Sequence, residues 1–297
     1  MQRRQFLKQT LGSIALGALA RPSFAATDWK TQAGIQLYTV RDLFEKDPEG
    51  TLAKVAELGF KEVEPTSYGK MDPKQFRAAL DRHGLKAPST HAGAQAGPGL
   101  EKQLEGFQTM GIQYTTISGG GGGGGRGPRT EESVKRSADQ QNKNGQLVKK
   151  FGMKILIHNH TEEFETLGDS KLRMFDVQLA ETDPALVTLE LDIGWASVAG
   201  QDIVEIFKKH PGRFELWHVK DAHGIKAMPP QSTPAERRRA AMLVPVGLGE
   251  VDYKTIFASA ALSGMKHFYV EQDNAASWGD SMAAARVSYQ NLVKALT

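Results

Sequence analysis

The chain contains no cysteine among its 297 residues. This absence excludes disulfide bonds, thiolate metal ligands and cysteine nucleophiles. The net charge is only +3, and no basic stripe interleaved with aromatic residues is present, so nucleic-acid binding is not expected. Hydrophobic residues make up 40% and charged residues 24%, which predicts a folded chain with enough core for one large domain or two small ones.

The N-terminus lacks a hydrophobic run long enough to cross a bilayer. Its apolar stretch, residues 11–20, falls short of the ~20 residues that a spanning helix requires. The stretch follows Arg3-Arg4-Gln5-Phe6-Leu7-Lys8, a twin-arginine segment, and precedes Ser23-Phe24-Ala25, a small-x-small cleavage pattern. We therefore predict a twin-arginine signal peptide over residues 1–25, a periplasmic location without stable membrane insertion after its removal, and a single domain over residues 26–297. A basic tail or an uncleaved membrane anchor is the alternative.

Short apolar runs alternate with longer amphipathic segments along the rest of the chain. The expected strands are Gly34–Thr39, Lys61–Glu64, Lys86–His91, Gln113–Ser118, Met153–Asn159, Val187–Asp192, Phe214–Lys220 and His267–Glu271. Asp47-Pro48 and Asp72-Pro73 predict two helix starts, and Gly59 and Gly84 the corresponding ends. Further helices are expected at Glu131–Phe151, Ser170–Glu181, Asp202–His210, Tyr253–Leu262 and Ser281–Leu296. Eight strand–helix units over ~250 residues predict an α/β fold, a closed (β/α)8 TIM barrel. An open doubly wound sheet is the alternative, but its glycine-rich loop is absent after the first strand.

Two segments depart from a minimal barrel. Gly119–Gly125 is an unbroken glycine run, and no Lys-Ser/Thr follows it at the spacing of a phosphate-binding loop, so a flexible loop is predicted rather than a phosphate cradle. Ile225–Val251 is a long polar insertion, expected to form a lid or rim at the carboxyl face of the barrel.

Residues able to bind a metal end four expected strands in the second half of the chain. Asp192, His218 and Glu271 end three of them, and the other ends in His158-Asn159-His160, followed by Glu162 and Glu163. Parallel strands direct such groups to one end of the barrel. Carboxylates and imidazoles without thiolates suit Mn²⁺, Mg²⁺, Co²⁺ or Zn²⁺. Each residue alone could instead cap a loop or pack in the core, and Glu190 could face a helix or the barrel interior.

Other polar and aromatic residues at strand ends could bind a polyol or orient a neighbour. The candidate substrate-binding residues are Gln36, Tyr38, Glu64, His91, Trp195 and Asp221. Lys220 shares a strand face with His218, which makes it a candidate catalytic residue together with His158 and His160.

The ordered set of these motifs resembles the sugar phosphate isomerase/epimerase family, whose members have a xylose isomerase-like barrel. The motifs are Gly34–Asp42, His158-Asn159-His160-x-x-Glu163-Phe164, Leu191-Asp192-Ile193-Gly194-Trp195, His218-Val219-Lys220-Asp221, Val246-Gly247-x-Gly249 and Val270-Glu271-x-Asp273. The resemblance implies a divalent metal held by Glu, Asp, His and Glu from the last four strands. Asp192, His218 and Glu271 match three of these ligands. Many relatives have a Glu where this chain has His158, so either Glu163 or His158 is expected to supply the fourth, with Glu163 as the replacement carboxylate. His160 or His158 is expected to act as the base.

The implied activity is metal-dependent isomerisation or epimerisation of a small carbohydrate through an enediolate. A non-phosphorylated sugar or keto-sugar is expected, because export separates the protein from cytoplasmic sugar phosphates. One alternative is a lyase or hydrolase that cleaves 3-keto-glycosides by β-elimination. The other is a non-catalytic periplasmic sugar-binding barrel. A homo-oligomer is compatible with the sequence, which identifies no interface.

Overall fold

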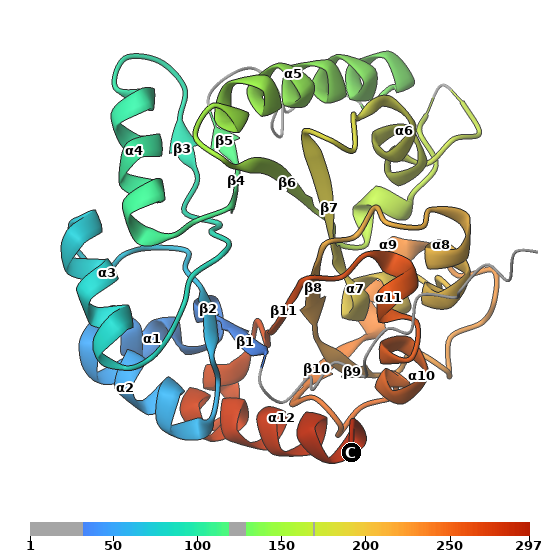
Figure 1. The fold of residues 1–297 in the computed structure, drawn as a ribbon. Helices are drawn as coiled ribbons and strands as arrows, with labels where there is room; N and C mark the ends of the chain where they lie inside the picture. The colour runs from blue at the N-terminus through green and yellow to red at the C-terminus, as the bar shows by residue number, and fades with distance from the viewer. Residues whose placement is uncertain (1–31, 119–128, 169) are drawn as a thin grey trace, which may run out of the picture.

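The computed structural model describes residues 32–118, 129–168 and 170–297, which form a ring of parallel strands surrounded by helices (Figure 1). The expected signal peptide and the Gly119–Gly125 run lie outside the described residues. No helix within the described ranges is long and apolar enough to cross a membrane.

The barrel wall is a parallel sheet in the order β2-β1-β11-β8-β7-β6-β4. Its strands are β1 (Ala33–Gln36), β2 (Glu62–Glu64), β4 (Tyr114–Thr115), β6 (Lys154–His158), β7 (Val187–Asp192), β8 (Leu216–Val219) and β11 (His267–Val270). Residues 86–90 close the ring through parallel bridges from Lys86 to Glu62 and from Ser89 to Tyr114. The eight segments follow one another around the ring in chain order, which confirms the predicted (β/α)8 barrel.

Helices pack around this ring, and most of them begin and end where the sequence predicts. They are α1 (Arg41–Phe44), α2 (Pro48–Leu58), α3 (Pro73–Arg82), α4 (Leu100–Met110), α5 (Glu131–Lys149), α6 (Met174–Glu181), α7 (Ile193–Val198), α8 (Ile203–Lys209), α10 (Tyr253–Phe257), α11 (Ala260–Ser263) and α12 (Ser281–Ala295). The expected caps form at α2, where Asp47 accepts a hydrogen bond from the Gly50 N–H and Gly59 adopts φ 111°. Helix α4 was not predicted, because its N-cap residue, Gly99, offers no side chain that would mark a helix start.

The polar insertion has regular structure of its own. Strand β9 (Asp221–His223) pairs antiparallel with β10 (Met242–Val244), and α9 (Pro234–Ala240) lies between them. Helix α9 contacts α7 and the one-turn helix η3 (Glu162–Phe164), both of which follow the carboxyl ends of barrel strands. A smaller parallel pair, β3 (Ala94–Gln95) and β5 (Ile117–Ser118), extends the same end of the barrel.

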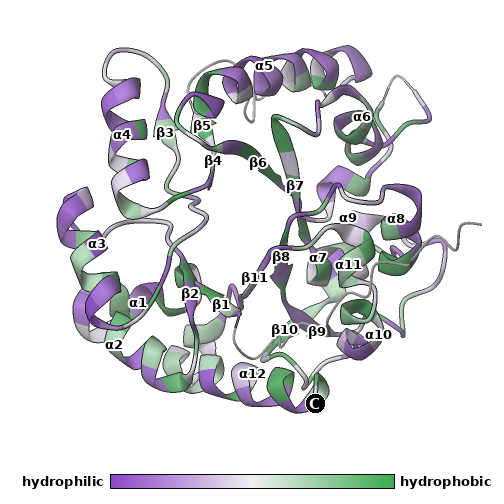
Figure 2. Cartoon of the chain, in the orientation of Figure 1, coloured by the Kyte–Doolittle hydropathy of each residue, from purple (hydrophilic) through white to green (hydrophobic). Residues whose placement is uncertain are grey.

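The two faces of the strands have different chemistry. On β7, Val187, Leu189 and Leu191 belong to the apolar core that packs against the helices. Glu190 and Asp192 alternate with them, are fully buried, and contact residues of other strands inside the barrel. Figure 2 shows the outer helices α3, α5 and α12 as mixtures of hydrophobic and hydrophilic residues, as expected for helices that cover such a core. The interior of the barrel therefore holds a buried polar site.

Candidate metal centre

Four residues at the carboxyl ends of neighbouring strands form the ligand cluster: His158, Asp192, His218 and Glu271. One donor atom from each lies within 4.8 Å of the others. His158 Nε2 is 3.2 Å from Asp192 Oδ2, and His218 Nδ1 is 2.7 Å from Glu271 Oε2. Strands β6, β7, β8 and β11 are consecutive in the sheet, so residues far apart in the sequence converge here.

The chemistry of this cluster fits a divalent cation. His218 Nδ1 is buried and makes no hydrogen bond of normal geometry, although Glu271 Oε2 lies 2.7 Å away. The same oxygen of Glu271 is 2.8 Å from Lys220 Nζ. A buried polar atom without a hydrogen bond calls for an explanation such as a bound ion. Two carboxylates and two imidazoles are ligands that Mn²⁺, Co²⁺ and Zn²⁺ accept.

Glu163 does not lie in the ligand cluster. It belongs to η3 and groups with His160 and Glu162 instead. Its Oε2 accepts a hydrogen bond from the backbone N–H of His160 at 2.7 Å, and its Oε1 is 3.9 Å from Arg129. The structure thus places Glu163, the expected ligand, at a turn beside His160, and His158 is the fourth member of the ligand cluster.

Lys220 lies beside the ligand cluster and is 1% exposed. Its Nζ is 2.7 Å from Asp273, 2.8 Å from Glu271 and 3.1 Å from Asp192. Burial alone would lower the pKa of Lys220, but these three carboxylates outweigh burial and raise that pKa above its ordinary value. The side chain is therefore a fixed positive charge at the site.

The same charges control the protonation of the ligand cluster. Burial and the neighbouring His218 lower the pKa of His158 to about 3, so its imidazole is neutral at physiological pH and can donate a lone pair. Burial would raise the pKa of Asp192, but Lys220 and His158 reverse this effect and hold that carboxyl below its usual range. His158 and Asp192 are thus in the protonation states that metal binding requires. His218 differs, because burial would lower its pKa but Glu190, Glu271 and Glu64 outweigh burial and raise that pKa well above the ordinary value, so a cation bound there must displace a proton from it.

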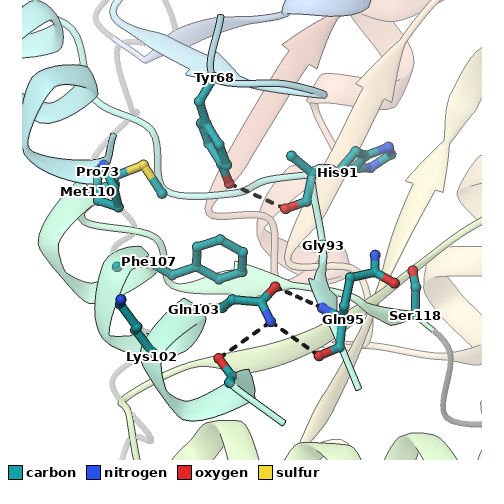
Figure 3. A pocket seen from close by; sticks show the side chains of 13 residues that line it. Tyr68, Pro73, His91, Gly93, Gln95, Lys102, Gln103, Phe107, Met110 and Ser118 are labelled. Atoms are coloured by element: carbon teal, nitrogen blue, oxygen red, sulfur yellow. Dashed lines mark hydrogen bonds between the residues drawn. The ribbon is translucent and has the colours of Figure 1, made fainter. Parts of the chain in front are cut away.

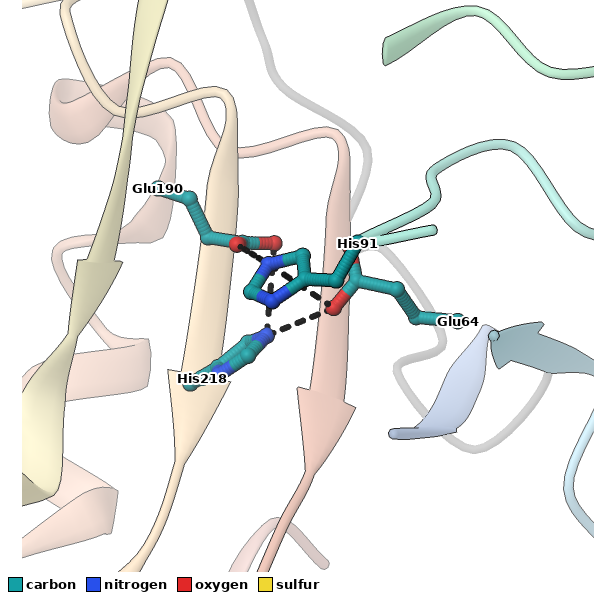
Figure 4. Close-up of side chains that lie close together, drawn as sticks. All are labelled: Glu64, His91, Glu190 and His218. Carbon is teal, nitrogen blue, oxygen red and sulfur yellow. Dashed lines mark hydrogen bonds and ion pairs between the residues drawn. The ribbon is translucent and has the colours of Figure 1, made fainter. Parts of the chain in front are cut away.

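A second buried group adjoins the ligand cluster through His218 and contains Glu64, His91 and Glu190 (Figure 4). His218 Nε2 is 2.6 Å from Glu64 Oε2, and His91 Nε2 is 2.5 Å from Glu190 Oε2. Glu64 also accepts hydrogen bonds from Gln36 Nε2 at 2.7 Å and from the Ser89 hydroxyl. We call Glu64, His91, Glu190 and His218 the tetrad.

The remaining predicted substrate-binding residues have different surroundings. Gln36 is buried and holds Glu64, whereas Tyr38 is 38% exposed, with the Arg41 guanidinium 3.8 Å from its ring centroid. Trp195 is buried beside Lys220, whose Nζ lies 5.7 Å from its ring centroid. Gln36 therefore contacts Glu64, and Trp195 lies next to Lys220.

Asp221 holds a loop together. It is 1% exposed, and its carboxylate accepts hydrogen bonds from the backbone N–H groups of Ala222, Gly247, Gly249 and Val251. Four backbone donors occupy the side chain. The structure thus places Asp221, expected to bind substrate, where it holds the loop that returns from the insertion.

Helix α9 and His160 lie at the outer end of the site. The His160 ring centroid is 4.9 Å from that of His158 and 6.3 Å from that of Trp195. Arg238 of α9 pairs with Glu162, and its guanidinium carbon lies 5.0 Å from the Trp195 ring centroid. The insertion thus contributes to the rim of the site, as predicted.

A cavity of about 590 Å³ borders His91 on the side of helix α4. Tyr68, Phe107 and Gln103 are among its lining residues. Figure 3 shows the His91 imidazole pointing away from Phe107 and Gln103. The ring of His91 therefore contributes to the tetrad, and no member of the ligand cluster lines the cavity.

Residues 52–287 match the family described as the xylose isomerase-like TIM barrel. The chain belongs to this family. Among curated proteins it is similar to the inosose dehydratases of Geobacillus kaustophilus and Geobacillus thermodenitrificans. The first is 27% identical over 231 residues, covering 70% of this chain and 73% of the relative. The second is 26% identical over 251 residues, covering 76% and 83%.

Solved structures with the same fold include a sugar phosphate isomerase/epimerase from Parabacteroides distasonis. It has a TM-score of 0.70 and 20% identity, covering 89% of this chain and 98% of the other. A D-allulose 3-epimerase from Methylomonas sp. has a TM-score of 0.62 and 14% identity, covering 89% and 98%. At these identities the structures support the fold of this family member.

Sequence reasoning did not assign Glu190 to the site. The available signal was the alternation of β7, because Glu190 is two residues before Asp192 and must share its face. A charged residue inside a barrel strand, with apolar neighbours on both sides, also requires a buried partner.

Proposed function

We propose that this protein is a divalent-metal-dependent lyase that acts on a small polyhydroxylated ketone. It removes the proton next to the carbonyl and expels the oxygen substituent at the β-carbon. The observation that carries this proposal is the ligand cluster, in which His218 Nδ1 is buried without a hydrogen bond and lies 2.7 Å from Glu271 Oε2.

His158, Asp192, His218 and Glu271 would hold the cation. A divalent cation bound there would act as a Lewis acid, polarising the substrate carbonyl and neutralising charge as the α-proton leaves. The neutral His158 supports this assignment, because an imidazole with a pKa of about 3 remains available as a ligand throughout the physiological range.

His160 is the proposed base. Its ring adjoins that of His158, and it is not a member of the ligand cluster, so neither of its nitrogens is needed for a cation bound there. Proton transfer to His160 gives an enediolate. Lys220 places a positive charge beside the developing negative charge, which lowers the energy of that state. The bond to the β-oxygen then breaks, a carbon–carbon double bond forms, and the departing oxygen takes up the proton held by His160 to leave as water or an alcohol.

The substrate class follows from the relatives and from the mouth of the site. The inosose dehydratases support a cyclic polyhydroxy ketone that loses water, and a 3-keto-glycoside that loses an alcohol requires the same steps. Arg238 pairs with Glu162, and Arg129 lies 3.9 Å from Glu163, so acidic partners neutralise these two cations. This pairing supports a substrate without a phosphate group.

An isomerase or epimerase is the second candidate. The His91 and His160 ring centroids lie 5.2 and 4.9 Å from that of His158, so two imidazoles flank the ligand cluster. If one imidazole removes a proton and the other returns it, the result is epimerisation rather than elimination. A non-catalytic sugar-binding barrel is less well supported, because it would not require the buried ligand cluster.

Metal analysis and product analysis test these candidates together. Full-length protein purified with its signal intact should contain close to one equivalent of a divalent metal, and Glu271→Ala should reduce this to a small fraction. The loaded protein is then incubated in D₂O with an inosose, a 3-keto-glucoside and ketohexoses. Loss of water or of the aglycone supports the lyase, whereas deuterium uptake without loss supports the isomerase. Metal binding without either reaction would overturn both.

A further inference from the structure

The tetrad consists of two histidine–glutamate pairs that lie side by side. His218 pairs with Glu64 at 2.6 Å, and His91 pairs with Glu190 at 2.5 Å. The cross distances are longer, at 3.4 Å from His218 to Glu190 and 3.6 Å from His91 to Glu64. The two imidazole rings are stacked, with centroids 5.1 Å apart and planes inclined by 24° (Figure 4). By distance, each histidine therefore has a different carboxylate as its nearest partner.

The first pair faces the ligand cluster. His218 directs Nδ1 toward Glu271, so a neutral His218 that binds a cation through Nδ1 must carry its hydrogen on Nε2. Glu64 is the closest acceptor for that hydrogen. Gln36 and Ser89 donate to the same carboxylate and fix its position. A carboxylate that accepts the second N–H of a metal-binding histidine orients the ring and raises its basicity.

The second pair contains no member of the ligand cluster. Glu190 is fully buried, and its Oε2 accepts from His91 while its Oε1 makes no hydrogen bond. His91 is 23% exposed, the most accessible side chain of the tetrad, and its ring lies 5.2 Å from that of His158. Glu190 is thus a buried carboxylate next to an accessible histidine, and it is suited to orienting the His91 ring toward a bound molecule.

We propose that the two carboxylates have separate tasks: Glu64 orients the metal ligand His218, and Glu190 orients His91 toward the substrate. Neither carboxylate is a metal ligand, and Glu190 is a positioning residue. This inference rests on the proposed function, because it assumes a cation on Nδ1 of His218 and a substrate next to His91.

A second cation within the tetrad is the competing explanation, because its four donor atoms also lie within 4.8 Å of one another. His218 would then have to lose the hydrogen on Nε2 and bridge two cations. Both carboxylates already have a histidine partner at hydrogen-bonding distance. The pairing of the tetrad therefore favours separate positioning tasks.

Histidine side-chain NMR on metal-free protein tests the pairing without any requirement for turnover. The chain has eight histidines, and ¹⁵N signals of His91 and His218 are assigned from His91→Gln and His218→Gln. Glu64→Gln should shift the Nε2 signal of His218 and leave that of His91 in place, and Glu190→Gln should do the reverse. If either variant shifts both signals equally, the tetrad acts as one unit and the proposal fails. This outcome is independent of whether the protein is a lyase.

Metal affinity and kinetics test the separate tasks. Titration with Zn²⁺ or Mn²⁺ should show that Glu64→Gln lowers the metal affinity by about 10- to 100-fold. This is the usual effect of removing a carboxylate that accepts a hydrogen bond from a metal-binding histidine. Glu190→Gln should bind the metal within about 3-fold of wild type, yet lower kcat/KM by about 10-fold or more through loss of orientation. In a His91→Gln background, Glu190→Gln should have little further effect on kcat/KM.

Three results would overturn the proposal. The first is that Glu64→Gln and Glu190→Gln lose metal affinity equally. The second is that wild type binds two equivalents of metal and Glu190→Gln binds one. The third is that Glu190→Gln has the same kcat/KM as wild type. If Glu190→Gln does not fold, Glu190→Asp serves in its place, because it keeps the charge but withdraws the oxygen from His91. Failure of wild type to bind any metal would instead count against the proposed function.

Discussion

His158 Nε2 lies 3.2 Å from Asp192 Oδ2, and this contact places an imidazole in the ligand cluster. Glu163, only five residues later, is held away from the cluster by the backbone N–H of His160. The order of strands around the barrel and the local turn after β6 together decide which side chain enters the site.

We expect His158→Ala to lower the affinity for Zn²⁺ or Mn²⁺ by at least about 100-fold, because one ligand is lost. The matched variant Glu163→Ala should bind the metal within about 3-fold of wild type, since its carboxylate only caps the turn. Calorimetric titration of both variants measures the difference. Equal losses, or a larger loss for Glu163→Ala, would restore Glu163 as a ligand.

Lys220→Met should destabilise the metal-free protein by about 3–5 kcal/mol, because removing one partner leaves buried carboxylates uncompensated. Bound metal should recover part of this loss by supplying positive charge to Asp192 and Glu271. Turnover should still fall by about 100-fold or more, since the charge beside the developing enediolate is missing. Urea unfolding with and without metal, together with kcat, measures these effects. Normal turnover in Lys220→Met would remove this residue from the mechanism.

Asp221→Asn should loosen the loop at residues 247–251, because an amide oxygen accepts more weakly than a carboxylate and the amide nitrogen meets backbone donors. The expected cost is about 1–3 kcal/mol. Hydrogen exchange should be faster at Gly247, Gly249 and Val251, whose N–H groups Asp221 accepts. If exchange is unchanged while KM rises sharply, Asp221 would be a substrate contact after all.

Low pH should reduce the free energy of unfolding partly through Glu215. This residue lies at the amino end of β8, opposite the end that carries the ligand cluster. Lys154 and the Tyr114 hydroxyl each lie 2.8 Å from its carboxylate. Burial would raise the pKa of Glu215, but hydrogen bonds from these two residues and from Lys266 outweigh burial and lower it. A lowered folded-state pKa stabilises the protein above the unfolded pKa of ~4.3, and the contribution is lost as the pH falls through the folded value.

The corresponding test compares Glu215→Gln with wild type by urea unfolding at several pH values. At pH 7 the variant should be less stable by about 1.5–3 kcal/mol, the usual range for hydrogen bonds to a charged group. The difference in the free energy of unfolding between the variant and wild type should disappear as the pH falls through the folded-state pKa of Glu215. The exposed control Glu101→Gln should differ from wild type by less than about 0.5 kcal/mol at every pH. A gap that persists in acid would assign the effect to packing rather than to charge.

Export by the twin-arginine route remains a prediction from the first 25 residues. Fractionation and N-terminal sequencing should find a periplasmic protein that begins at Ala26. Replacing both Arg3 and Arg4 by lysine should leave the full-length chain in the cytoplasm. A cleaved periplasmic product from that double variant would point to a different route.

The sequence by itself determined the fold and three of the four members of the ligand cluster. The period of the apolar runs marked the strands, and residues at the carboxyl ends of parallel barrel strands must face one common site, so Asp192, His218 and Glu271 were identified correctly as neighbours. Helix caps at Asp47 and Asp72 were local signals of the same kind.

Only the tertiary structure decided how the polar groups pair. Glu64 and His218 are 154 residues apart, and His91 and Glu190 are 99 apart, so their contacts depend on the closure of the whole ring. The roles of Glu163 and Asp221 depended on which backbone N–H groups their loops present, and no side-chain pattern encodes this. Local periodicity fixes which face a residue occupies, but barrel closure fixes which partner it meets there.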